Sequence, residues 1–109
     1  MKLGILGGGQ LGMMMCQAAK IIDISTVVYS DSIDSPAINF SEKYFIDKYD
    51  NFLKIDDFIK YCDVITFEFE NIPFETLNYI NSKIDVFPSP KTNNIIQDRL
   101  SEKNFINNL

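Results

Sequence analysis

The sequence predicts an α/β domain built on a doubly wound parallel sheet. Strand-like and helix-like segments alternate along the chain without internal repeats or low-complexity linkers, which is the pattern of consecutive β-α-β units. A glycine-rich turn, GGGQLG at residues 7–12, separates the first apolar strand from the first helix. The run DVITF at residues 63–67 is apolar enough for a parallel strand that is covered on both faces. Ligands of such a sheet bind at the carboxyl ends of its strands.

Length and composition restrict the class of protein. The 109 residues have the length of one domain, spanning 1–109, which can bury a modest core. The net charge of −5, with dispersed basic residues, argues against a nucleic-acid partner. No segment approaches the roughly 20 apolar residues of a membrane span, and the first residues read as a strand rather than a signal peptide. We therefore expect a cytoplasmic protein with no membrane partner.

The residue types present exclude one kind of chemistry. The chain contains no His, so acid–base catalysis by His and metal sites that contain His are excluded within it. Cys16 lies in a helical apolar pattern and Cys62 lies just before a strand. In a reducing compartment both are expected to be buried, unpaired thiols.

The first half of the chain is expected to supply three strands and one helix. Residues 2–6 form the first strand, residues 26–29 the second, and residues 43–46 a short edge strand after the turn-rich segment at 30–37. The helix after the glycine turn has apolar residues at helical spacing, which predicts that this face is buried. Its members are Leu11, Met14, Met15, Ala18 and Ile22.

The second half continues the alternation. A helix is expected at about residues 51–61, a buried strand at 63–67, a helix opened by Pro73, and a last short strand at 85–88. Ser89 followed by proline is a cap and first-turn pair, which predicts the start of a final helical stretch. The apolar faces of the helix at about 51–61 and of the helix opened by Pro73 contain Phe52, Ile55, Ile59, Phe74, Leu77 and Ile80.

The glycine turn predicts a ligand that carries phosphate. Gly7, Gly9 and Gly12 fit the pattern G-x-G-x-x-G between a strand and a helix, where glycines let a phosphate approach the backbone and the helix dipole favours negative charge. The pattern leaves open a dinucleotide, ATP, a sugar phosphate, or a tight turn without a ligand. Asp31 lies 19 residues after Gly12, near the place of the acidic residue that binds ribose in dinucleotide folds. An NAD(P)-binding module is therefore an alternative.

Two later segments carry polar residues that a scaffold does not need. TFEFENIP at residues 66–73 places Glu68, Glu70 and Asn71 at the carboxyl end of a buried strand. In an extended chain the two glutamates face the same side, where they either bind a ligand above the sheet or are solvated loop carboxylates. The second segment, SPKTNNIIQDRLSEK, carries Arg99, which is the only arginine of the chain.

These segments resemble one enzyme family in order and in kind. GILGGGQLG, DSPA at residues 34–37, TFEFENIP and PSP…QDRLSEK look like the N-terminal domain of 5-(carboxyamino)imidazole ribonucleotide synthases, which are ATP-grasp enzymes of de novo purine biosynthesis. The resemblance covers essentially the whole chain and implies a Rossmann-like pre-ATP-grasp domain. The implied reaction joins aminoimidazole ribonucleotide and bicarbonate with ATP, and yields carboxyaminoimidazole ribonucleotide, ADP and phosphate on the route to IMP.

The resemblance also implies roles for individual residues. Arg99 would contact the ATP phosphates, for which a permanently charged donor fork is suited. No catalytic residue and no metal ligand is expected here, because the ATP clamp and the Mg²⁺ ligands of the family lie in ATP-grasp domains that this chain lacks. We therefore expect the chain to fold but not to hydrolyse ATP by itself, and the full-length protein to be a homodimer. The implied substrate-binding residues are Gly9, Gln10, Leu11, Glu68, Glu70 and Asn71.

Met13 departs from the family pattern, which often has Arg at this position, so a possible phosphate contact is missing. The nearest alternative is the N-terminal domain of formate-dependent glycinamide ribonucleotide transformylases. That family usually has Glu at the position of Gln10 and an EIEA-type motif in place of EFEN, which argues against it. A stand-alone nucleotide-sensing domain is a third, non-enzymatic alternative.

Overall fold

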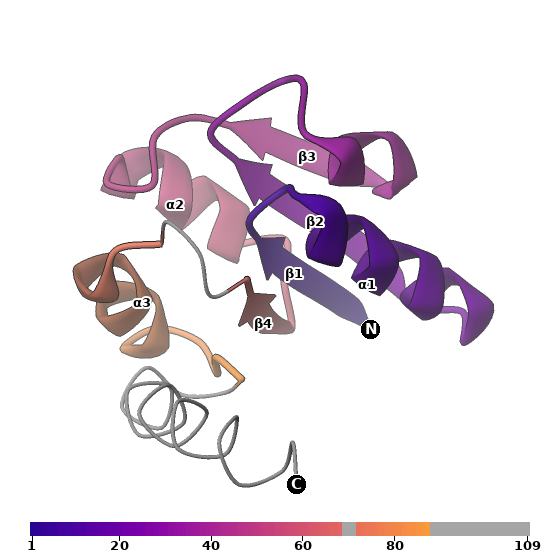
Figure 1. Ribbon diagram of the computed structural model, residues 1–109. Helices are drawn as coiled ribbons and strands as arrows, with labels where there is room; N and C mark the ends of the chain where they lie inside the picture. Colours follow the sequence, from indigo (N-terminus) through magenta and orange to yellow (C-terminus); the bar gives the residue numbers. More distant parts are fainter. Residues whose placement is uncertain (69–71, 88–109) are drawn as a thin grey trace, which may run out of the picture.

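The computed structural model describes residues 1–68 and 72–87, which form a parallel sheet with helices on both faces (Figure 1). This confirms the predicted α/β class. The predicted helical stretch after Ser89, as well as Glu70, Asn71 and Arg99, lies outside the described residues. The strands are β1 (Lys2–Leu6), β2 (Ser25–Ser30), β3 (Lys43–Ile46) and β4 (Val64–Phe67); the helices are α1 (Gln10–Ile21), the 3-10 helix η1 (Pro36–Phe40), α2 (Phe52–Ile59) and α3 (Phe74–Asn81).

The order of the strands creates a switch point beside β1. In the sheet order β3-β2-β1-β4 all pairs are parallel, and Leu3 of β1 pairs with Thr26 of β2 on one side and with Val64 of β4 on the other. The chain therefore builds outward in one direction through β2 and β3 and then returns to add β4 beside β1. Where the order reverses, the turns that follow β1 and β4 diverge, and such a crevice is the usual ligand site of an open α/β sheet.

The face of the sheet under α2 and α3 holds the larger core. Side chains alternate along a strand, so β1 sends Leu6 to this face and β2 sends Val27 and Tyr29. They pack with buried residues of α2, α3, β4 and the segment after α3, which are Ile55, Phe58, Ile65, Phe67, Leu77, Ile80 and Val86. The ring of Phe58 lies 5.4 Å from that of Tyr29 and 6.0 Å from that of Phe45, measured between centroids. Aromatic packing thus dominates this face.

The opposite face, under α1 and η1, holds a smaller core. Its buried cluster consists of Ile5, Val28, Cys16 and Ala37, with Leu3, Met13 and Met15 packed against it. The small side chains let α1 and η1 lie close to the sheet and to each other (Figure 1).

The predicted buried face of α1 is wrong. Leu11, Met14, Ala18 and Ile22 are exposed, and Met15 is half-buried, whereas the buried residues of the helix are Gly12, Cys16 and Ala19. Both faces of this helix are apolar, so periodicity alone does not tell which one meets the sheet. The smaller residues face the sheet because they permit a closer approach of the helix axis.

Several other expectations needed smaller corrections. The segment at 30–37, predicted to be a turn, runs into η1. Phe52 and Phe74, expected in the core, are exposed. The predicted strand at 85–88 is reduced to a single bridge between Val86 and Ile65. The prediction of two free thiols is confirmed, although only Cys16 is fully buried and Cys62 is intermediate.

Candidate functional site

The glycine turn joins the carboxyl end of β1 to the start of α1. Its first residue is anchored to β2 because the Gly7 N–H donates to the carbonyl oxygen of Tyr29 at 2.8 Å. Gly7 has a φ of +113°, which strongly disfavours a side chain, and a Cβ there would lie 2.8 Å from Oε2 of Glu68. The turn is thus shaped around a side chain that arrives from the end of β4.

That side chain, Glu68, caps helix α1 from a distance. Its Oε1 accepts a hydrogen bond from the Gly12 N–H at 2.7 Å, and its Oε2 accepts one from the Gly9 N–H at 3.1 Å. Gly9 is the N-cap residue and has no side chain to supply an acceptor. In a capping box two different side chains satisfy these two donors. Here one carboxylate satisfies both, and it also brings a negative charge to the positive end of the helix dipole.

Two backbone N–H groups at the start of α1 have no hydrogen-bond acceptor among the described residues. The first four N–H groups of a helix have no partner within it, and in α1 these belong to Gly9, Gln10, Leu11 and Gly12. Glu68 takes the outer two. No hydrogen bond from the Gln10 or Leu11 N–H to any acceptor is found within residues 1–68 and 72–87. The free donors therefore belong to the two residues that the resemblance assigns to the substrate.

A cavity of about 200 Å³ opens beside the capped turn, at the carboxyl ends of β1, β2 and β4. Two of its lining hydroxyl groups, those of Ser30 and Ser35, are hydrogen-bonded to each other. Among the described residues this lining contains two carboxylates and no Lys or Arg, so its charge suits donors such as hydroxyl and amino groups rather than a phosphate. The lining residues are Gly8, Gly9, Ser30, Asp31, Ser35, Tyr49 and Glu68.

Tyr49 adds a neutral hydroxyl group to this cavity. Burial raises the pKa of Tyr49, and the negative charges of Asp31 and Glu68 raise it further. The phenol therefore stays protonated at neutral pH and retains a hydrogen to donate. The loop before α2 supplies this residue, which comes from a segment that the motifs do not touch.

The structure brings together four of the seven residues that the resemblance assigned. Gly9, Gln10, Leu11 and Glu68 meet at the start of α1, whereas the other three lie outside the described residues. Sequence reasoning missed Ser30 and Tyr49 as parts of the site. Ser30 ends β2, so its place at the carboxyl end of a predicted strand is the signal that points to it. Tyr49 has no comparable signal.

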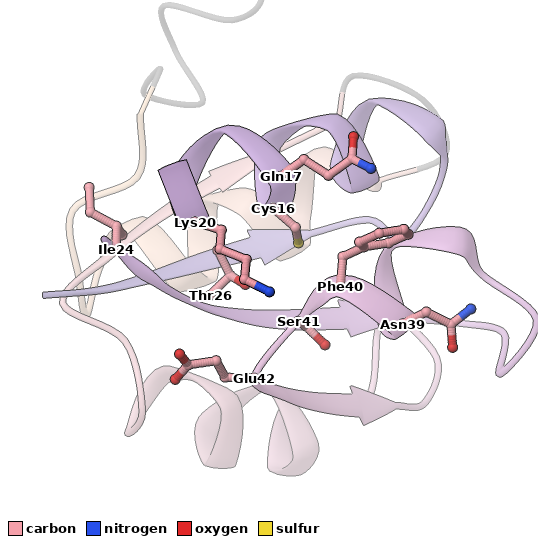
Figure 2. Close-up of a pocket in the computed structure, with 9 residues that line it drawn as sticks. All are labelled: Cys16, Gln17, Lys20, Ile24, Thr26, Asn39, Phe40, Ser41 and Glu42. Atoms are coloured by element: carbon pink, nitrogen blue, oxygen red, sulfur yellow. The ribbon is translucent and has the colours of Figure 1, made fainter. Parts of the chain in front are cut away.

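A second cavity, of about 240 Å³, lies between α1 and the segment that joins η1 to β3 (Figure 2). The lining of this cavity includes Thr26, which lies near the start of β2. The cavity is therefore away from the ligand edge of the sheet. Cys16 also lines it, but burial raises the pKa of this thiol, which makes it a poor nucleophile. Lys20 and Glu42 bring opposite charges to it.

Two further features bear on the class of protein. Within the described ranges no helix has the length and apolar character of a membrane span. The same ranges contain no group of three or more acidic, Cys or His side chains placed to hold a metal ion.

Comparison with known proteins identifies relatives over nearly the whole chain. The N5-carboxyaminoimidazole ribonucleotide synthase of Staphylococcus aureus is 38% identical over 101 residues, which cover 93% of this chain and 27% of the relative. The N5-carboxyaminoimidazole synthetase of the same organism, solved in complex with ADP, superposes with a TM-score of 0.81 at 37% identity and covers 94% of this chain and 28% of that one.

The corresponding synthase from Aspergillus clavatus was solved in complex with ADP and 5-aminoimidazole ribonucleotide. It superposes with a TM-score of 0.75 at 29% identity, over 98% of this chain and 29% of that one. The chain thus spans about a quarter of the length of the synthases that it matches. The family model of the ribonucleotide synthetase pre-ATP-grasp domain matches residues 1–97, and the chain belongs to this family.

Proposed function

We propose that the chain is the substrate-side domain of an N5-carboxyaminoimidazole ribonucleotide synthase. In this proposal the whole protein uses ATP to join bicarbonate to aminoimidazole ribonucleotide, and it releases ADP and phosphate in purine biosynthesis. Membership of the family, the names of the relatives and the bound ligands of the Aspergillus clavatus enzyme support it. The alternative of a glycinamide ribonucleotide transformylase finds no support in the relatives named above.

The observation that carries the proposal is the double hydrogen bond of Glu68 to the glycine turn. Its two oxygens accept from Gly9 and Gly12, and each oxygen has a further lone pair with which to accept from a ligand. The adjacent N–H groups of Gln10 and Leu11 have no acceptor among the described residues and are available to donate. A hydroxyl group of the ribonucleotide, which both donates and accepts, satisfies both kinds of partner, and its amino group satisfies the carboxylate alone.

The same geometry orients the ligand. A phosphate in the cavity would lie close to the carboxylates of Asp31 and Glu68 and would be repelled. At about 200 Å³ the cavity accommodates one ring, since pockets for larger ligands begin at roughly 300 Å³. We therefore place the aminoimidazole or ribose ring here, with the phosphate pointing away from the turn.

An NAD(P)-binding role conflicts with this arrangement. A dinucleotide would need the N-terminal donors of α1 for its pyrophosphate, and Glu68 occupies two of them. Titration with NADH, followed by nucleotide fluorescence, is expected to show no saturable binding at micromolar concentrations.

The remaining roles belong to the whole protein. We propose that Arg99 contacts the ATP phosphates and that Glu70 and Asn71 extend the substrate contact of Glu68. Mg²⁺ would be held by ligands in the other domains. We also propose that the complete protein is cytoplasmic and that it is a homodimer.

Titration of the ¹⁵N-labelled chain with aminoimidazole ribonucleotide tests the site. We expect the amide signals of Gln10 and Leu11 to shift in a saturable way. Glu68→Gln should weaken the binding by roughly 10- to 100-fold, because a charge-assisted contact is lost. Glu42→Gln, which alters the second cavity instead, is the matched control and should bind as the parent does.

Ribose 5-phosphate and inorganic phosphate complete the titration. If inorganic phosphate alone shifts the Gln10 and Leu11 amides as strongly as the ribonucleotide does, the proposed orientation is wrong. In the protein that carries its remaining domains, ADP release should require both bicarbonate and aminoimidazole ribonucleotide. Turnover with glycinamide ribonucleotide and formate instead would assign the chain to the transformylases.

A further inference from the structure

The loop between β3 and α2 is fastened to the core at two consecutive residues. The carbonyl oxygen of Lys48 accepts a hydrogen bond from the hydroxyl group of Tyr29 at 2.6 Å. The carbonyl oxygen of Tyr49 accepts one from the hydroxyl group of Thr76 at 2.7 Å. The side chains of Tyr29 and Thr76 are buried, so their hydroxyl groups need partners inside the protein. The loop therefore has a fixed position before a ligand binds.

Thr76 makes a contact that its own helix does not require. Threonine is a comparatively weak helix former, and inside a helix its hydroxyl group commonly bonds to a carbonyl of the preceding turn. Thr76 lies in the first turn of α3, and its hydroxyl group instead reaches Tyr49, which is 27 residues away along the chain. The contact thus fixes the loop rather than the helix.

The side chain of Tyr49 borders the cavity at the carboxyl end of β2. Its ring lies 5.9 Å from that of Tyr29, measured between centroids. The side chain of Ser30 and the backbone of Asp31 lie within hydrogen-bonding reach of its hydroxyl group. Asp31 belongs to the same lining and is exposed. A phenol donor and a carboxylate acceptor therefore border one small space.

The polar groups of this cavity suit a sugar better than an aminoimidazole. Ribose offers two adjacent hydroxyl groups, each of which donates and accepts, whereas aminoimidazole offers one amino group and one ring nitrogen acceptor. The amino group also has to stay accessible, because it is the reacting group in the proposed function. In dinucleotide folds an acidic residue after the second strand binds ribose hydroxyls, and Asp31 directly follows β2.

From this geometry we infer that Asp31 and Tyr49 together recognise the two ribose hydroxyl groups of the ribonucleotide and set a preference for ribose over deoxyribose. The carboxylate accepts from both hydroxyl groups, and the phenol donates to one of them. Thr76 and Tyr29 are positioning residues, because they hold the loop that carries Tyr49. This assignment rests on the proposed function and deepens it, since it selects the ribose ring as the occupant of the cavity.

Titration of the ¹⁵N-labelled chain with ribose 5-phosphate and with 2-deoxyribose 5-phosphate tests the pair. The parent should bind the ribose compound about tenfold more tightly, because the deoxy compound leaves polar groups of the cavity without a partner. Tyr49→Phe should reduce this preference by roughly three- to tenfold, and Asp31→Asn should reduce it at least as much. Tyr44→Phe, on β3 and 47% exposed, is the matched control and should keep the preference of the parent.

The positioning role of Thr76 has its own pair of variants. Thr76→Val removes the hydroxyl group at nearly constant volume and should lower the preference for ribose. Thr76→Ser retains the hydroxyl group and should keep the preference. Urea denaturation, recorded in parallel, gives the free energy of unfolding, and circular dichroism confirms that each variant folds. If Thr76→Val destabilises the chain but leaves the preference unchanged, the contact is only structural and the positioning role is wrong.

Equal binding of the two sugar phosphates by the parent, or an unchanged preference in both Tyr49→Phe and Asp31→Asn, overturns the inference. Binding of aminoimidazole ribonucleotide without any binding of ribose 5-phosphate overturns it as well, because the cavity then holds the aminoimidazole ring. In each of these cases the proposed function stands. A failure of aminoimidazole ribonucleotide itself to bind would overturn both.

Discussion

The two faces of the sheet are built on different principles. The face under α2 and α3 buries ten residues in one cluster and contains most of the aromatic contacts. The face under α1 and η1 buries four, among which only Ile5 and Val28 are large. Small residues bring α1 close to the sheet, and the large apolar residues of this helix point outward.

The two faces of the sheet therefore have different roles: one stabilises the domain, and the other provides the contacts with a ligand. The α2–α3 face supplies the buried area that holds the domain together, while α1 offers a helix end for the ligand. A helix held by few buried contacts tolerates an unusual start, in which the capping carboxylate comes from another element.

The largest expected effect breaks the α2–α3 face. Phe58→Ala should lower the free energy of unfolding by about 3–5 kcal/mol, because it opens a cavity among Tyr29 and Phe45. Cys16→Ala on the other face removes only the Sγ atom and should cost roughly 1 kcal/mol. Urea denaturation measures both values. Leu53→Ala, an exposed position of the same helix as Phe58, is the control; equal losses at Phe58 and Cys16 would refute the comparison.

A smaller effect concerns the start of α1. Glu68→Ala leaves the N–H groups of Gly9 and Gly12 without their acceptor, which should cost about 1–2 kcal/mol. Glu68→Gln retains one acceptor oxygen and should cost about half as much. Hydrogen exchange gives the local readout, since the Gly12 amide should lose protection in Glu68→Ala. If Glu42→Ala, at the second cavity, destabilises the chain equally, the capping role is wrong.

A third effect appears only at alkaline pH and compares the two thiols. Burial, with a contribution from the charge of Asp63, raises the pKa of Cys62 to about 12. The folded state therefore holds this proton more tightly than the unfolded state, whose thiol has a pKa of about 8.5. The contribution of Cys62 to the free energy of unfolding is therefore fully present below that pH, and it is lost as the pH rises toward 12.

In Cys62→Ala this alkaline decline of the free energy of unfolding should be shallower. Cys16→Ala is the matched comparison and should flatten the curve less, although burial raises the pKa of Cys16 as well. Burial also raises the pKa of Tyr29, so some decline should remain in both variants. Denaturation curves recorded from pH 7 to pH 11 decide the point, and identical slopes in the parent and Cys62→Ala would contradict it.

Elements whose apolar residues allow only one arrangement in the core were predicted well. β1 and β3 have the predicted bounds, because each is a short run ended by turn residues. The position of α1 in the sequence was predicted correctly, but its buried face was not. Leu11 and Cys16 lie on opposite apolar faces of the helix, and which face is buried depends on its packing against the sheet. η1 was missed because Pro36 among serines and aspartates also reads as a turn.

The site was predicted in its parts but not in its assembly. Residue patterns and the family resemblance singled out the glycine turn and Glu68 separately. The contact between them depends on β4 pairing with β1, and a single sequence contains no local signal for that register. The phosphate expected at the turn followed from the glycines alone, whereas the glycines also admit the carboxylate of Glu68.

The long-range cap has a consequence for how the chain is made. Glu68 follows Gly12 by 56 residues, so a growing chain completes β1, α1 and β2 well before the acceptor for the helix end has been translated. At 5–20 residues per second this interval lasts about 3–11 s. The first turn of α1 stays uncapped until β4 inserts beside β1, so the ligand edge matures later than the unit of β1, α1 and β2.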